Sequence, residues 1–130
     1  MPPSAPCPCG RAKPYGQCCG PLHAGTPATD AEALMRSRYT AYVLGDVSYL
    51  MASWHPDTRP DDLDLGDAGA TRWLGLEVKR HVAVDAMHAT VEFVARSRTG
   101  GAPAVRMHEV SRFVREGDHW FYVDGEFPGR

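Results

Sequence analysis

Four cysteines, the full complement of the chain, lie within a short N-terminal segment, CPCGRAKPYGQCC. They form two close pairs, Cys7 with Cys9 and Cys18 with Cys19, joined by a loop that contains glycine and proline. Such a loop can turn sharply and bring the two pairs together. Four clustered sulfur ligands are typical of a tetrahedral zinc site, although iron also accepts them. We therefore predict that these four cysteines bind one metal ion, zinc in first place and iron as the alternative.

Disulfide or redox chemistry is the main alternative for this cluster. Pairing within either close pair would strain a bond that prefers Cα atoms about 5.5 Å apart, although pairing across the loop is feasible. The first ten residues, MPPSAPCPCG, contain neither the basic stretch nor the apolar run of a secretory signal. We therefore expect a cytoplasmic location, where thiols stay reduced and available to metals. His23 is a further alternative, as a ligand in place of Cys19.

The expected role of the metal is structural. Four thiolates leave no open coordination position for water or substrate, and the metal can contribute on the order of 10 kcal/mol to folding a segment that buries little surface. The loop between the pairs carries Arg11, Lys13, Tyr15 and Gln17. We predict that these four residues contact a protein partner, because basic and aromatic side chains are frequent in interfaces. Tyr15 has the alternative of packing against the metal loop itself.

Length and composition allow one globular domain and a small appendage. The chain has 130 residues, of which 43% are hydrophobic and 23% charged. No apolar run approaches the roughly 20 residues that span a bilayer, so we expect no membrane span. A formal net charge of -2 provides no overall attraction to nucleic acid, so DNA binding is not expected and direct RNA recognition is a weak third option. The oligomeric state is left open.

Apolar residues recur at helical spacing after the cysteine segment. Thr29 and Glu32 have the spacing of a capping box, which predicts a helix over residues 30–44. Asp46 can cap a second short helix that runs through Trp54, before a His-Pro pair ends it. The two segments together predict a helical hairpin.

The remainder of the chain alternates apolar and polar residues with the period of a β-strand. An Asp-, Gly- and Pro-rich stretch, residues 57–71, is predicted to be an exposed connection before the first strand. Short turn segments then separate four predicted strands, at residues 73–84, 87–98, 104–115 and 119–124. Helices followed by consecutive strands predict an α+β fold in which a curved antiparallel sheet packs on the helices.

The cysteine segment, with CPCG followed by KPYGQCCGPLH, resembles the SEC-C metal-binding motif known from the SecA translocation motor. The segments LMRSRYTAY, SWHP, WLGLEV, FVARS and EVSRFVREGDHWFYVDG resemble the YchJ family of small SEC-C proteins. The resemblance implies that residues 1–27 form a SEC-C module with Cys7, Cys9, Cys18 and Cys19 as ligands. It also implies a nuclear transport factor 2-like (NTF2-like, or cystatin-like) domain over residues 28–130.

The resemblance further implies a partner. SEC-C modules are associated with the SecB export chaperone and with ribosomes, so a role as a metal-stabilised adaptor near protein export or nascent chains is expected. The motif usually continues Gly-Ser-Gly-Lys after the first cysteine pair, whereas this chain has Gly10-Arg11-Ala12-Lys13. This departure changes the contact surface of the loop and leaves the ligands intact.

A small-ligand binder or an enzyme is the competing hypothesis, because a sheet curved around helices forms a concave pocket. The titratable candidates on or near the strands are His81, His108, Glu109 and Asp124. His108 and Glu109 are adjacent and therefore point to opposite faces of a strand, where they cannot form one acid-base pair. The sequence contains no nucleophile motif or phosphate loop, so an enzyme is the less expected class and we assign no catalytic residue.

Overall fold

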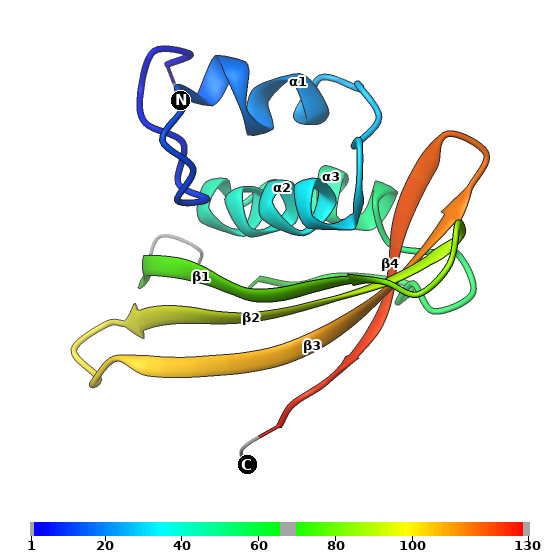
Figure 1. Cartoon of the computed structure of the whole chain (residues 1–130). Helices are drawn as coiled ribbons and strands as arrows, with labels where there is room; N and C mark the ends of the chain where they lie inside the picture. The colour runs from blue at the N-terminus through cyan, green and yellow to red at the C-terminus, as the bar shows by residue number, and fades with distance from the viewer. Residues whose placement is uncertain (1, 66–69, 129–130) are drawn as a thin grey trace.

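Helices cover one face of a four-stranded antiparallel sheet, and the N-terminal segment lies on the far side of the helices (Figure 1). The computed structural model describes residues 2–65 and 70–128. The N-terminal half contains a 3-10 turn and three helices: η1 Tyr15–Gln17, α1 Cys19–His23, α2 Ala31–Leu44 and α3 Val47–Ala52. The strands follow in sequence order: β1 Thr71–Ala83, β2 His88–Thr99, β3 Val105–Glu116 and β4 His119–Glu126.

Helix α2 lies where the sequence predicts a helix, but its N-terminal cap differs from the prediction. Asp30, in extended conformation, accepts a hydrogen bond from the backbone N–H of Ala33 at 2.7 Å. Glu32 pairs with Arg36 one turn later, at 2.9 Å, and does not close a capping box. The predicted Thr29–Glu32 box is therefore wrong, because an adjacent aspartate provides a stronger cap and the glutamate has a cationic partner.

Helix α3 begins as predicted and ends earlier. The side chain of Asp46 accepts a hydrogen bond from the N–H of Tyr49 at 3.0 Å, which confirms the predicted cap. The helix stops at Ala52, two residues before the predicted end, because the chain there joins the sheet. The carbonyl of Ser53 accepts from the N–H of Tyr122 at 2.9 Å, which removes Trp54 from the helix and places it beside β4.

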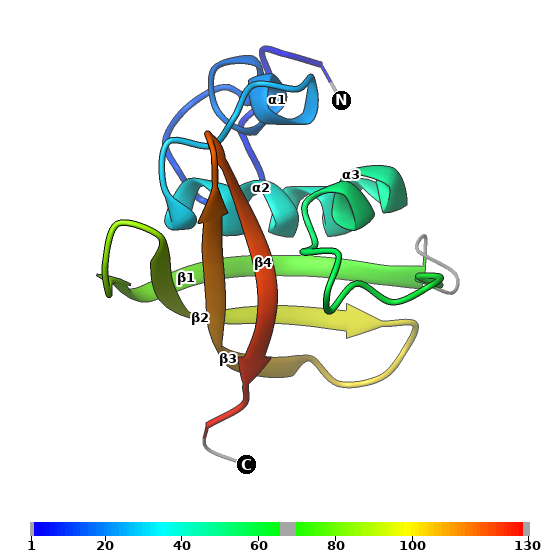
Figure 2. The same cartoon turned by 90° about the vertical axis from the view of Figure 1, so that its right-hand side faces the viewer.

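The four predicted strands are confirmed, and none of their ends is shifted by more than two residues. They pair in the order β1-β2-β3-β4, and Gly100 and Gly117 adopt the positive φ values of 57° and 63° that their hairpin turns require. Register shifts in β1 and between β3 and β4 mark bulges, which increase twist and curvature. As a result the β3–β4 hairpin turns upward along the side of the helices (Figure 2).

The core lies between α2 and the inner face of the sheet. The buried side chains come from one face of α2 and from alternate positions of the strands: Ala31, Leu34, Met35, Tyr39, Ala89, Val91, Phe93, Ala95 and Phe113. The structure thus confirms the predicted α+β arrangement. The predicted connection over residues 57–71 lies partly outside the described residues, and the division of the chain after residue 27 stays a prediction. Within residues 2–65 and 70–128, no helix is long and apolar enough to span a membrane.

The revised cap provides a test of the helix assignment. Asp30→Ala removes the acceptor for an N-terminal N–H of α2, and we expect it to lower the free energy of unfolding by about 1 kcal/mol. Thr29→Ala is the matched control, because the exposed Thr29 side chain makes no hydrogen bond within the described residues. Chemical denaturation at constant metal content measures both. If Thr29→Ala lowered the free energy of unfolding more than Asp30→Ala, the Thr29–Glu32 capping box would be supported instead.

Candidate metal centre

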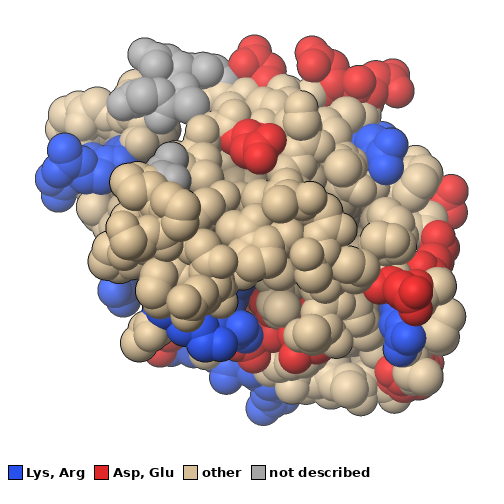
Figure 3. Space-filling model, turned by 90° about the horizontal axis from the view of Figure 1, so that it is seen from above, with Lys and Arg blue, Asp and Glu red and all other residues tan. Residues whose placement is uncertain are grey.

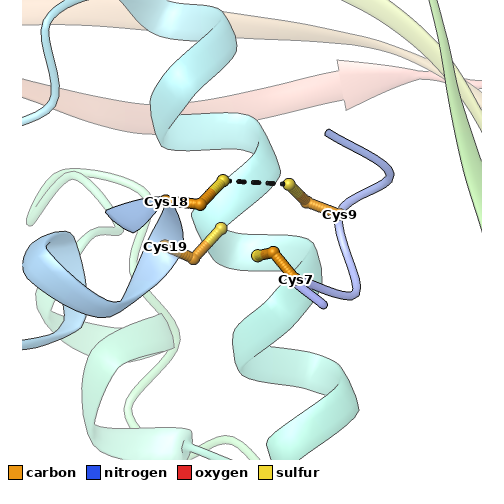
Figure 4. A group of neighbouring side chains, drawn as sticks. All are labelled: Cys7, Cys9, Cys18 and Cys19. Atoms are coloured by element: carbon orange, nitrogen blue, oxygen red, sulfur yellow. Dashed lines mark hydrogen bonds between the residues drawn. The ribbon is translucent and has the colours of Figure 1, made fainter. Parts of the chain in front are cut away.

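The four cysteine side chains converge on one point. Their Sγ atoms all lie within 4.8 Å of one another, and three of the four residues are buried. The side chains of Cys7 and Cys9 point toward those of Cys18 and Cys19 (Figure 4). The four are free thiols, with 3.5 Å between the Sγ atoms of Cys9 and Cys18, well beyond the length of a disulfide bond. Tetrahedral zinc requires sulfur atoms about 3.8 Å apart, so the cluster could hold a metal ion with little movement.

Two short backbone segments bring the cysteine pairs together. The first pair lies on one arm of a small hairpin, in which the N–H of Cys7 donates to the carbonyl of Lys13 at 3.0 Å and that of Tyr15 donates to Ala5 at 2.8 Å. Gly10 turns the chain with a φ of 90°, a conformation that suits glycine. The second pair follows η1, and Cys19 begins α1. The sequence predicts the turn, but neither of these short helical segments.

The cluster is anchored on α2 by polar contacts. The hydroxyl of Thr40, which is fully buried, donates to Cys19 Sγ at 3.3 Å and lies 3.8 Å from Cys7 Sγ. One turn earlier, Arg36 Nη1 donates to the carbonyl of Cys9 at 2.7 Å. Thr40 and Arg36 were not identified from the sequence, because they are 21 to 33 residues away from the cysteines they contact. Both cysteine pairs are therefore held against the same helix.

The cysteine thiols of the cluster differ in pKa, so they do not carry negative charge equally. The thiol of Cys19 donates a hydrogen bond to Cys9, and together with the N–H of Arg11 it lowers the pKa of Cys9 to about 4. Burial, together with the negative charge of Cys9, raises the pKa of Cys18 to about 12. The hydrogen bond to Cys9, followed by burial, also raises the pKa of Cys19. In the absence of metal the first negative charge thus resides on Cys9, and a divalent cation would be needed to ionise Cys18 and Cys19.

The four residues predicted to contact a partner are placed differently from one another. Lys13 and Gln17 are exposed. Arg11 is partly exposed and lies 3.5 Å from the carboxylate of Glu32 on α2. Tyr15 is half-buried against the cysteine cluster, and this burial raises its pKa. Two of the four side chains are therefore available to a partner, and the other two help hold the segment on the protein.

His23 is hydrogen-bonded away from the sulfur cluster. Its Nε2 lies 2.9 Å from the carbonyl of Ser37, which can only accept, so Nε2 carries the proton. Its Nδ1 is 2.7 Å from the hydroxyl of Tyr15, and a neutral ring accepts that proton. Among residues 2–65 and 70–128, the side chains grouped closely enough to hold an ion are those of the four cysteines, without His23. The alternative of His23 as a ligand is thus disfavoured by its contacts.

The candidates for acid-base chemistry are dispersed over the sheet. His108 Nε2 lies 2.7 Å from Glu92, Asp124 is paired with Arg112, and His81 Nδ1 is 3.8 Å from Glu32. Glu109 lines a cavity of about 350 Å³ between α2 and the sheet, and the other three candidates do not line this cavity. No acid-base pair forms among these four residues.

Two family models match the chain. One is described as the SEC-C motif and matches residues 4–21; the other is described as YchJ, middle NTF2-like domain, and matches residues 30–125. A UPF0225 protein from Xanthomonas campestris pv. campestris is 61% identical over 122 residues, covering 94% of this chain and 95% of that protein. A UPF0225 protein from Ralstonia nicotianae is 60% identical over 136 residues, covering 95% of this chain and 92% of that protein.

Solved structures share the whole arrangement. The solution structure of a SEC-C motif containing protein from Rhodopseudomonas palustris is 38% identical with a TM-score of 0.81, covering 92% of this chain and 96% of that one. The crystal structure of a SEC-C motif containing protein from Psychrobacter arcticus is 33% identical with a TM-score of 0.78, covering 95% and 84%. Fold and site thus define a protein that joins a SEC-C segment to an NTF2-like domain, which confirms the predicted fold class. The chain belongs to the YchJ, or UPF0225, family.

The unequal sharing of charge can be tested on reduced, metal-free protein. With a pKa of about 4, Cys9 ionises well below neutral pH. We therefore expect an acidic step in ultraviolet thiolate absorbance for the wild type, and its loss in Cys9→Ser. Cys18→Ser is the matched control and retains the step, because Cys19 remains to donate to Cys9. A wild-type titration without this step would contradict the low pKa of Cys9.

Proposed function

We propose that this chain is a metal-stabilised adaptor in which one zinc ion, bound by Cys7, Cys9, Cys18 and Cys19, holds the SEC-C module in a shape that binds a protein partner. The observation that carries the proposal is the convergence of four sulfur atoms on one point. Iron is the alternative ion, since a tetrahedral sulfur site accepts both. Four sulfur ligands close the site, so the metal has a structural role.

The anchoring of the module on α2 supports a binding role. The polar contacts of Thr40 and Arg36 fix its inner side, while Lys13 and Gln17 project from its outer side. A contact surface fixed in this way loses little conformational entropy when a partner binds. Seen from the side that carries the module, the surface is mostly uncharged, with acidic and basic groups mainly toward its margins (Figure 3). Such a surface suits a protein better than a nucleic acid backbone.

The proposed partners are an export chaperone of the SecB type and a ribosomal component, which the resemblance of the cysteine segment to SEC-C modules implies; residues 4–21 match that motif. The proposed location is the cytoplasm, where both are found. The contact residues are Lys13 and Gln17 in first place, with Arg11 and Tyr15 at the edge of the surface.

Metal content tests the first half of the proposal. Protein purified without added metal is expected to contain one equivalent of zinc or iron and to have four thiols protected from alkylation. Cys18→Ser removes one ligand and should reduce the metal content several-fold, because a three-sulfur site binds far more weakly. His23→Gln keeps a donor for the Ser37 carbonyl and should retain the full equivalent. Elemental analysis with thiol titration decides, and metal-free protein with two disulfides would contradict the proposal.

Partner capture tests the second half. Lys13→Glu combined with Gln17→Ala alters the outer side of the module without touching a sulfur ligand. We expect at least about tenfold weaker capture of SecB-type chaperone or ribosomes, as for loss of an interface hot spot, with metal content unchanged. Arg98→Glu with Thr99→Ala is the matched control, since both residues are exposed at the end of β2. Equal losses in both variants, or none in either, would refute the proposed surface.

A further inference from the structure

A cavity of about 350 Å³ lies inside the α+β domain, between α2 and the concave face of the sheet. Two small residues leave the space open on the sheet side, Ala95 on β2 and Ser111 on β3. The curvature of the sheet prevents α2 from filling it. This volume is in the range of pockets that hold drug-sized molecules. The cavity is separate from the cysteine cluster and plays no part in the proposed adaptor function.

Aromatic rings form most of the cavity wall. Tyr39 and Tyr42 of α2 approach Trp73 of β1, with ring centroids 5.6 and 5.9 Å apart. On the other side Trp54 meets Tyr122 of β4 edge to face, at 5.1 Å. Rings in these arrangements are rigid and present flat apolar surfaces. The shape and chemistry of the wall therefore suit a planar aromatic ligand.

A buried cation lines the same cavity. Arg38 of α2 is only 6% exposed, and its guanidinium lies 4.5 Å from the centre of the Tyr122 ring. Its Nη1 donates to the carbonyl of Leu50 at 2.9 Å and to the hydroxyl of Ser53 at 2.6 Å. Within residues 2–65 and 70–128, Nε and Nη2 make no hydrogen bond. Neither nitrogen is among the fully buried side-chain atoms that lack a hydrogen bond, so these N–H groups keep accessible surface and are available to a ligand in the cavity.

A buried carboxylate complements this cation. Glu109 of β3 is 6% exposed and lines the cavity. Its Oε2 accepts from the hydroxyls of Ser111 at 2.7 Å and Tyr122 at 2.9 Å, whereas Oε1 accepts no hydrogen bond from the described residues. Gly125 of β4 packs so closely that a side chain there would overlap the carboxylate. Glu109 is therefore held in place, and its Oε1 is available to accept a hydrogen bond from a ligand.

The two charges offset each other and select the ligand. A charged ligand would be attracted by one of these groups and repelled by the other, so it would gain little to offset the loss of its own hydration. A neutral ligand with both a carbonyl and an N–H satisfies the donor and the acceptor together. From the aromatic walls and this donor-acceptor pair we infer that the cavity binds an uncharged, planar heteroaromatic molecule that carries a lactam group, with Arg38 bound to its carbonyl and Glu109 to its N–H.

The test is a titration of full-length, metal-loaded protein with 2-quinolinone, a neutral bicyclic lactam, observed by NMR at the tryptophan indole N–H groups. Trp54 and Trp73 line the cavity, whereas Trp120 does not and is the internal reference. We expect saturable shifts of the first two signals alone. N-methyl-2-quinolinone lacks the donor and should bind about tenfold more weakly, as for loss of a hydrogen bond to a charged group. Quinoline-2-carboxylate and N-methylquinolinium should bind more weakly still.

Three variants locate the binding. Met107 lines the cavity and is 38% exposed, so Met107→Trp should obstruct the entrance and abolish binding. Met87→Trp is the matched control, because Met87 is 44% exposed in the turn after β1 and should leave affinity unchanged. Glu109→Gln keeps the shape and replaces the free acceptor with an N–H donor, so it should weaken 2-quinolinone about tenfold and leave the N-methyl compound unaffected.

Several results would overturn the inference. The cavity would not be a ligand site if 2-quinolinone caused no saturable shift up to its solubility limit, or if Met107→Trp bound as well as the wild type. Tighter binding of the carboxylate or of the quinolinium would refute the selection of a neutral ligand. Equal losses of both quinolinones in Glu109→Gln would refute the role of Glu109. None of these outcomes depends on metal content or on partner capture.

Discussion

The packing of the cysteine segment on helix α2 is the interaction on which the arrangement of this protein depends. The segment is too short to have a core of its own, so its folded shape relies on the sulfur cluster and on the helix beneath it. Thr40 and Arg36 provide that support from one side of α2, by contacting Cys19 and the carbonyl of Cys9. The sulfur cluster and the packed helix thus together hold this small segment in place.

The opposite side of α2 faces the sheet. It provides Leu34, Met35 and Tyr39 to the core and Arg38 to the cavity. One helix therefore contacts the cysteine segment with one face and the sheet with the other.

Curvature of the sheet determines how much space the helix leaves. The bulges in β1 and between β3 and β4 bend the sheet around α2, and Ala95 and Ser111 are too small to close the gap. Burial of Arg38 beside this gap is costly unless its N–H groups have partners. The carbonyl of Leu50, the hydroxyl of Ser53 and two aromatic rings offset part of that cost.

The sequence by itself determined the local features. Strand alternation, the glycine turns and the cap at Asp46 depend on residues a few positions apart, and the structure confirms them. Convergence of the cysteines was predictable for the same reason, because all four lie within one short segment. The cap of α2 is also a local feature, but its prediction was wrong, because Asp30 accepts from the first turn and Glu32 pairs with Arg36.

Only the tertiary structure decided which distant residues meet. Thr40 and Arg36 under the sulfur cluster, the hydrogen bond between Tyr15 and His23, and the shared cavity of Arg38 and Glu109 gave no signal in the sequence. Periodicity indicates which face of an element is buried, but not which partner covers it. That choice depends on strand register, on sheet curvature and on the orientation of α2, which are set by packing of the whole chain.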